Sequence, residues 1–137
     1  MNHINKIEHI GIAVKDIDTA NDVYQKLLGV PPYKKEAVES EAVITSFFKV
    51  GDSKIELLAS THEEGPIAKF IAKKGEGIHH IAFDVDNIVQ ELDRLENEGF
   101  QLINTTPKKG ADHKLVAFVH PKTTHGVLVE LCQNIVS

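Results

Sequence analysis

The sequence predicts an α+β fold in which two tandem βαβββ modules form one curved mixed sheet. Three observations lead to this prediction. The pattern of strands and helices in the first half begins again near residue 78, matching segments lie at an almost constant spacing, and each half carries one histidine and one glutamate at matching places. The 137 residues are enough for a single domain with its own core.

The first module is expected over about residues 5–60. Residues 7–14 alternate in hydrophobicity as a strand does, and Asp16 follows in the N-cap position of a helix. Gly29 is expected to end that helix. Residues with helical spacing predict its apolar face: Ile17, Ala20, Tyr24, Leu27 and Leu28.

The rest of the first module is expected to be a loop followed by a β-hairpin. Pro31 and Pro32 cannot continue a helix and open the loop. Two β-rich runs, 43–50 and 54–59, flank Gly51 and Asp52, a pair typical of hairpin turns.

A linker of about residues 65–74 separates the modules, and within it residues 66–74 read as a short helix. A glycine-containing hinge at 75–77 leads into the second module, expected over about 77–133. Its strand at 78–85 and its helix at 87–98, with apolar residues Ile88, Leu92 and Leu95, repeat the start of the first module. Two further strands are expected at 115–120 and 127–132.

The repeat can be checked by subtraction. His9 and His80 begin matching strands at an offset of 71 residues (80 minus 9), and Glu56 and Glu130 lie near the ends of matching strands at an offset of 74 (130 minus 56). Only two copies are present, so the repeat is not a solenoid. Two copies more naturally pair about a pseudo-twofold axis and enclose something between them.

The four repeated residues predict a metal site. Singly, each has a simpler explanation, because a histidine in a strand is often a hydrogen-bonded core residue and a glutamate often faces solvent. Together, His9, Glu56, His80 and Glu130 recur in the same register, where an inward carboxylate is costly unless it is paired or binds a metal. Two imidazoles and two carboxylates suit a divalent ion such as Zn, Ni, Co, Fe or Mn, with open octahedral positions.

Charge and composition argue that the chain is not a nucleic-acid-binding, membrane-spanning or secreted protein. A net charge of −5 without a basic tract disfavours a nucleic-acid surface, and no run approaches the roughly 18 apolar residues of a membrane span. The N-terminal residues lack the apolar core of a secretory signal, so a cytoplasmic location is expected. Cys132 is the only cysteine and is expected to be a buried thiol in the last strand.

The clearest group of basic residues lies near the C-terminal strands. Such a group is usually a solvated face, and the alternative is a seat for an anionic small molecule. Its members are Lys108, Lys109, Lys114 and Lys122. His79 must point away from the face of His80, and the other histidines are expected at the surface or around the ligands: His3, His62, His113, His120 and His125.

With these residues in view, nearly the whole chain resembles the vicinal oxygen chelate (glyoxalase/bleomycin resistance/dioxygenase) superfamily, and is most similar to its methylmalonyl-CoA epimerase branch. The segments that carry the resemblance are 8–14, 65–70, 77–86, 120–122 and 126–131. The resemblance implies a glyoxalase-like fold and one divalent ion (Co, Zn, Ni or Mn) held by His9, Glu56, His80 and Glu130. It also implies a homodimer.

The activity that the resemblance implies is epimerisation of methylmalonyl-CoA through an enolate-type intermediate. The ion would act as a Lewis acid, and Glu130 would be one acid/base. Lys108, Lys109, Lys114 and Lys122 would meet the phosphates of the acyl-CoA substrate.

The loop before the second strand departs from the epimerase pattern. Some epimerases have a Pro-Glu-Gln-Gly loop and a glutamate in the following strand, whereas this chain has Glu39-Ser40-Glu41-Ala42, and the strand position falls near Ile44 or Thr45. Glu41 is the candidate substitute for the second acid/base. Two other functions stay open: a glyoxalase I-type isomerase, and a non-catalytic member of the fold that binds a small molecule.

Overall fold

The computed structural model describes residues 3–135, so Met1 and Asn2 of the segment used to judge the N-terminus lie outside the described residues. The chain forms two compact units. The first unit is His9–His79, and the described residues of the second are 3–8 and 80–135. No helix among the described residues is long and apolar enough to cross a membrane.

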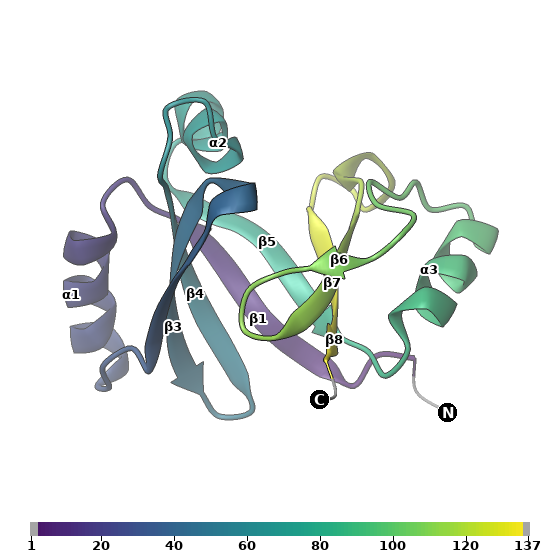
Figure 1. Ribbon diagram of the computed structural model, residues 1–137, viewed down its shortest axis with the longest axis horizontal. Coiled ribbons are helices and arrows are strands. Elements are labelled where there is room, and N and C mark those ends of the chain that lie inside the picture. Colours follow the sequence, from purple (N-terminus) through teal and green to yellow (C-terminus); the bar gives the residue numbers. More distant parts are fainter. Residues whose placement is uncertain (1–2, 136–137) are drawn as a thin grey trace. The chain divides into compact units, whose positions relative to one another are not determined.

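The first unit contains a four-stranded mixed sheet in the order β2-β3-β4-β1 (Figure 1). The β2–β3 and β3–β4 pairs are antiparallel, and β4 pairs with β1 in parallel. A short 3-10 turn, Glu39–Glu41, joins β2 to β3. The elements are β1 (Lys6–Ala13, in this unit from His9), α1 (Ile17–Leu28), β2 (Lys34–Val38), β3 (Val43–Val50), β4 (Ser53–Ser60) and α2 (Pro66–Lys74).

The second unit repeats this arrangement in the order β5-β8-β7-β6. Here β5 and β8 are parallel, and the β8–β7 and β7–β6 pairs are antiparallel. A 3-10 turn, Pro121–Thr123, follows β7. The elements are β5 (Gly77–Asp84, in this unit from His80), α3 (Ile88–Asn97), β6 (Lys108–Lys109), β7 (Lys114–Val119) and β8 (Val129–Asn134).

The predicted duplication is confirmed at the level of strand register. Gly11 of β1 lies opposite Glu56 of β4, and Ala82 of β5 lies opposite Glu130 of β8. In each unit the histidine lies two positions before that strand residue, so the two βαβββ modules use the same residues in the same places. The strands β2 and β6 had no individual prediction, because β2 has a polar sequence (KKEAV) and β6 has only two residues.

Helix α1 packs on the face of β3 and β4 that its apolar residues cover (Figure 1). Asp16 caps its start by accepting hydrogen bonds from Asp18 N and Thr19 N, and Gly29 ends it with a left-handed φ of 76°. The predicted apolar face is wrong at Leu27, which is 70% exposed. Leu28 packs in the core of the first unit. Successive helical residues are about 100° apart around the axis, so Leu27 lies beside the buried face of the helix and points to solvent.

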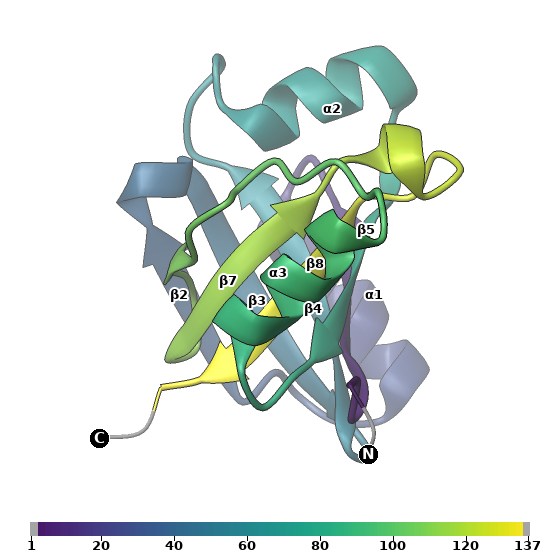
Figure 2. The same cartoon turned by 90° about the vertical axis from the view of Figure 1, so that its right-hand side faces the viewer.

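Helix α3 covers β7 and β8 in the same way (Figure 2). Its predicted apolar residues Ile88, Leu92 and Leu95 all pack in the core of the second unit, with Leu131 of β8 among their neighbours. Asn87 caps the start of the helix by accepting a hydrogen bond from Gln90 N.

Replacing Leu92 with alanine is expected to lower the free energy of unfolding by about 2–5 kcal/mol, because the side chain is only 2% exposed and its removal leaves a cavity. Leu27→Ala is the matched control, since the same change in an exposed helical position should alter stability by less than about 0.5 kcal/mol. Urea denaturation of both variants measures the difference. Equal losses would contradict the assigned packing of α3.

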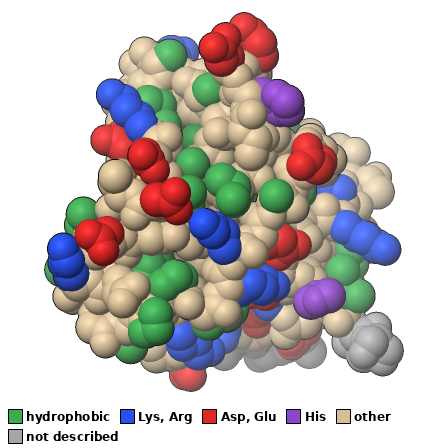
Figure 3. All heavy atoms as spheres, turned by 60° about the vertical axis from the view of Figure 1, so that its left-hand side comes forward, with side chains coloured by type: hydrophobic (Ala, Val, Ile, Leu, Met, Phe, Trp, Pro, Cys, Tyr) green, Lys and Arg blue, Asp and Glu red, His purple; other side chains and the backbone are tan. Residues whose placement is uncertain are grey.

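The surface carries acidic and basic side chains that are interspersed on the face shown in Figure 3. Two surface ion pairs involve α1. Lys26 and Asp22 of the helix are 3.3 Å apart, and Asp18 of the helix is 3.4 Å from Lys35 of β2. Lys26 and Asp22 are 77% and 73% exposed at their side chains, so solvent screens their attraction and the pair contributes little to stability.

Candidate metal-binding and active site

The first unit brings His9 and Glu56 together. His9 lies on β1 and Glu56 on the parallel neighbour β4, and their side chains share one face because Gly11, two residues after His9, is the register partner of Glu56. His9 Nδ1 lies 3.0 Å from Glu56 Oε2, and both side chains are more than nine-tenths buried. A buried carboxylate therefore has an imidazole nitrogen as its immediate neighbour.

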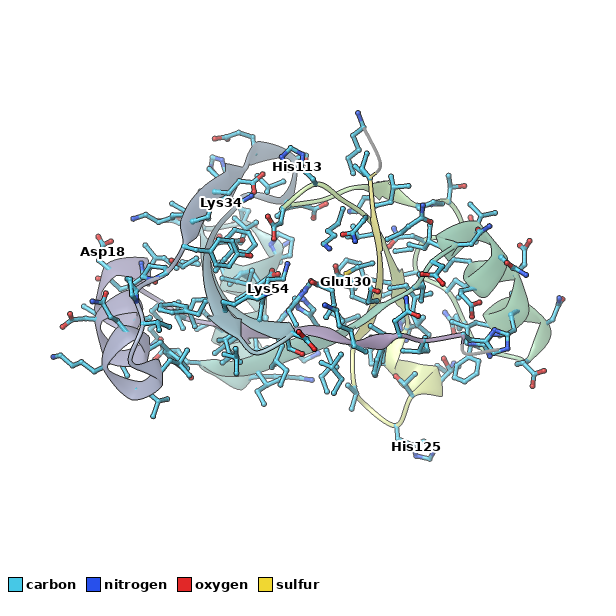
Figure 4. The ribbon with its side chains drawn as sticks, turned by 90° about the horizontal axis from the view of Figure 1, so that it is seen from below. Asp18, Lys34, Lys54, His113, His125 and Glu130 are labelled. Carbon is cyan, nitrogen blue, oxygen red and sulfur yellow. The ribbon has the colours of Figure 1, made fainter. Side chains whose placement is uncertain are left out.

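The second unit contains the equivalent pair. His80 Nε2 lies 2.9 Å from Glu130 Oε1, and the other carboxylate oxygen accepts a hydrogen bond from Cys132 Sγ at 3.1 Å. The edge of the His80 ring also contacts Phe118, with ring centroids 5.8 Å apart. Glu130, marked in Figure 4, is thus held by contacts to both of its oxygens.

The donor atoms of each pair fit a divalent ion. Two ligand atoms that lie about 2.1 Å from one ion, with their bonds at a right angle, are roughly 3.0 Å apart. The separations of 3.0 and 2.9 Å match this spacing, and imidazole nitrogen with carboxylate oxygen is a donor set that Zn, Co, Ni and Mn accept. The same separations also suit a hydrogen bond within each pair. Each unit can therefore supply two adjacent ligands.

His79 has different neighbours from His80, as strand alternation predicts. Its ring meets Phe70 of α2 edge-on, at a centroid distance of 4.8 Å, and it lies in the first unit. His80 is buried and faces Glu130. His79 thus contacts the linker helix.

The structure does not gather the four predicted lysines into one cluster. Lys108 and Lys109 on β6 are exposed and lie beside the start of β7, where Lys114 stands. Lys114 Nζ is 3.6 Å from Glu8 Oε2 and also contacts Asn134. Lys122 follows the far end of β7, roughly 17 Å along the strand from Lys114. Lys108 therefore shares a strand face with Lys114, Lys109 points to the opposite face, and Lys122 lies apart from them.

Glu41 is half-buried in the 3-10 turn before β3. The first residue of β3, Val43, pairs with Ser60, whereas Glu56 pairs with Phe47 four residues further on. The turn is therefore at least about 13 Å from the Glu56 pair along the strands. Its role as the second acid/base stays a prediction.

Thr45, one of the two residues predicted near the strand position of the second acid/base, is buried and lies opposite Glu36 of β2. Glu36 is half-buried, and its carboxylate is 3.2 Å from Lys34 Nζ. The carboxylate of Glu36 is therefore on the strand next to Thr45. The sequence had predicted only Glu41, in the loop, as the substitute acid/base.

Two features of the site had no sequence prediction. Lys54 is buried beside Glu56, with Nζ 3.9 Å from Glu56 Oε2. Its spacing of two residues from Glu56 already places it on the same strand face. The thiol of Cys132 was expected to be buried, which is confirmed, but its hydrogen bond to Glu130 was not expected. The same i, i+2 spacing explains that contact.

Comparison with known proteins shows which proteins this chain resembles. Residues 8–118 match the family described as the Glyoxalase/Bleomycin resistance protein/Dioxygenase superfamily. An uncharacterized protein of Bacillus subtilis is 41% identical over 95% of this chain and 93% of its own length. An ethylmalonyl-CoA/methylmalonyl-CoA epimerase of Cereibacter sphaeroides is 38% identical over 95% of this chain and 98% of its own.

A solved structure shares the whole arrangement. The methylmalonyl-CoA epimerase of Streptomyces coelicolor, in complex with 2-nitronate-propionyl-CoA, superposes with a TM-score of 0.93 at 32% sequence identity. The match covers 97% of this chain and 96% of that one. The predicted glyoxalase-like fold of two βαβββ modules is therefore confirmed.

Proposed function

This chain belongs to the Glyoxalase/Bleomycin resistance protein/Dioxygenase superfamily, and we propose that it is a metal-dependent epimerase that acts on methylmalonyl-CoA. The observation that carries the proposal is the pair of equivalent His–Glu contacts, one in each βαβββ module. Relatives described as methylmalonyl-CoA epimerases support the choice of substrate.

The two pairs would serve as one ligand set, His9, Glu56, His80 and Glu130, for a single divalent ion. This part of the proposal rests on the sequence repeat and on the matching register of each pair. When bound, the ion supplies Lewis acidity toward the thioester carbonyl oxygen, which makes the α-proton of the substrate easier to remove. The identity of the metal stays open among Co, Zn, Ni and Mn.

Glu130 is the proposed acid/base on one side of the α-carbon. A carboxylate can accept the α-proton at one oxygen, and the two oxygens of Glu130 are oriented by His80 Nε2 and by the Cys132 thiol. A second group must return a proton to the opposite side to invert the centre, and Glu41 is the sequence candidate for that role. Lys108, Lys109, Lys114 and Lys122 are the proposed contacts for the phosphates of coenzyme A, and of these Lys108 and Lys114 share one strand face.

One observation favours a second candidate function. The strand position where some epimerases have a glutamate falls near Ile44 or Thr45, and neither a hydrocarbon nor a hydroxyl of ordinary acidity is a good proton acceptor. An isomerase of the glyoxalase I type, in which one carboxylate moves a proton between neighbouring carbons, needs no second base. The expected homodimer and the expected cytoplasmic location stay predictions.

The test is exchange of the α-proton of methylmalonyl-CoA with deuterated solvent, followed by NMR, using protein loaded with Co²⁺. We expect exchange together with interconversion of the two epimers. Exchange without epimerisation would mean that only one acid/base acts. Absence of exchange in a fully metallated sample would overturn the proposal, and thiol-dependent loss of methylglyoxal in a parallel assay would favour the isomerase.

A further inference from the structure

A partly open cavity of about 340 Å³ lies between helix α3 and the sheet of the second unit. Leu95 lines it from the helix, and Val119 and Leu131 line it from β7 and β8. Both strand residues are almost completely buried. The volume falls at the lower end of the roughly 300–1,000 Å³ of small-molecule sites, which are mostly apolar and have few polar groups.

The cavity lies on the opposite side of this sheet from the His80–Glu130 pair. Leu131 directly follows Glu130 in β8, and successive strand residues point to opposite faces of a sheet. A ligand in the cavity would therefore not occupy the positions around the candidate metal ligands. The cavity is a second place in the fold where a small molecule can bind.

The internal repeat explains why this space exists. Tyr24 matches Leu95 and Phe48 matches Val119, both at the repeat offset of 71 residues (95 minus 24, and 119 minus 48). In the first unit the two rings pack between α1 and the sheet with their centroids 6.4 Å apart, and Phe48 is completely buried. The second unit has two smaller aliphatic groups at the same places, which leaves space between its helix and its sheet.

Arg94 of α3 is the charged residue among those that line the cavity. Its Nε donates to Glu91 Oε1 at 2.7 Å, and the other oxygen of Glu91 lies 3.1 Å from His3 Nδ1. The Glu91 side chain is only 7% exposed, whereas that of Arg94 is 32% exposed. A guanidinium has five N–H donors, so the bond through Nε uses only part of this donor set. The Nη end can therefore serve a second carboxylate, as a planar fork that fits its two oxygens.

We propose that this cavity binds a small amphipathic carboxylate, of the class of a medium-chain fatty acid. The hydrocarbon chain would lie between α3 and the sheet, in the space that two aromatic rings fill in the first unit. The carboxylate would meet the Nη end of Arg94 in a charge-assisted pair at the edge of the cavity. The inference goes beyond the proposed function and does not depend on it, because the cavity and the His80–Glu130 pair lie on different faces of the sheet.

Octanoate is the probe, added to full-length protein loaded with Zn²⁺, and methyl signals in ¹H–¹³C NMR locate where it binds. We expect octanoate to shift the methyl signals of Leu95, Val119 and Leu131. The signals of Leu57, which matches Leu131 in the first unit, should stay in place. Acetate, which has the charge without the chain, should shift none of them. The neutral 1-octanol should bind at least about 10-fold more weakly than octanoate, because it lacks the charged partner of Arg94.

The double variant Leu95→Tyr with Val119→Phe gives the second unit the two rings of the first, and it should abolish octanoate binding. Val89→Tyr is the matched control, because it adds the same ring at a position of α3 that is 56% exposed, and it should leave the affinity unchanged. Arg94→Met should weaken octanoate binding about 10- to 100-fold and leave 1-octanol binding unchanged. A folding defect would weaken both ligands together, so this comparison isolates the guanidinium.

Three results would each overturn the site. Octanoate could leave the three methyl signals in place, or its shifts could centre on Ala82 and Val116, which pack together on the face of the sheet that carries His80. Arg94→Met could weaken octanoate and 1-octanol equally, which would reject the carboxylate contact. None of these measurements involves methylmalonyl-CoA, so failure of this site and failure of α-proton exchange are observed independently.

Discussion

Replacing Glu130 with glutamine is expected to lower kcat for α-proton exchange by about 10²- to 10⁴-fold, the usual contribution of a general acid/base. The amide keeps an oxygen that can coordinate a metal but cannot take up a proton at physiological pH. The bound metal should therefore persist, with at most a moderate loss of affinity. Metal content by atomic emission and exchange by NMR, measured on the same samples, separate the two effects.

Glu56→Gln is the matched variant, because Glu56 holds the equivalent position in the other module. Its carboxylate is next to Lys54, whereas one oxygen of Glu130 accepts a hydrogen bond from Cys132. In the proposed function Glu56 holds the metal and takes no part in proton transfer. The Glu56 variant should thus lose far less of kcat than the Glu130 variant. Equal losses would contradict the assignment of Glu130 as the acid/base.

The sequence alone was sufficient to predict which residues become neighbours wherever the same strand register occurs in both modules. His9 with Glu56, and His80 with Glu130, are adjacent because each histidine lies two residues before the strand partner of its glutamate. Strand periodicity is two residues in every sheet, so the same spacing in both modules determines which side chains share a face. The capping residue Asp16 was equally predictable, since its hydrogen bonds are local.

Features that depend on neighbouring strands could not be predicted in the same way. Strand β2 has no apolar run and exists because β3 offers it hydrogen-bond partners, and the two residues of β6 exist because of β7. The burial of Lys54 follows from its position between Glu56 and the Phe47 ring, which lies on a different strand. Leu27 was predicted to be buried but faces solvent, because an apolar residue can lie beside the buried face of a helix without packing in the core.

Removing either ligand histidine is expected to eliminate binding of the single metal ion. If His9, Glu56, His80 and Glu130 form one ligand set, the unaltered protein binds one ion per chain. His9→Ala and His80→Ala should then each weaken affinity by more than about 100-fold, since even outer-shell partners of a metal are typically worth 10- to 100-fold. Calorimetric titration with Co²⁺ or Zn²⁺ gives both the stoichiometry and the affinity.

Thermal stability provides an independent measurement of the same prediction. A ligand present at 100 to 1,000 times its Kd stabilises the folded state by about 2.7–4.1 kcal/mol. For a chain of this size that corresponds to a rise in Tm of roughly 10 °C. His62→Ala is the control, because His62 is exposed and lies in the turn after β4, away from both pairs in sequence. It should show the full rise, and the two ligand variants should show almost none.

The stoichiometry also distinguishes a shared site from two independent ones. Each His–Glu pair alone has the spacing of two adjacent ligands, so each module could in principle hold its own ion with water completing the coordination. Two ions per chain, falling to one in either His→Ala variant, would contradict the single ligand set. A two-ligand site binds far more weakly than a four-ligand site, because the ion keeps most of its water and gains fewer protein donors. One tightly bound ion that both variants abolish is therefore the expected result.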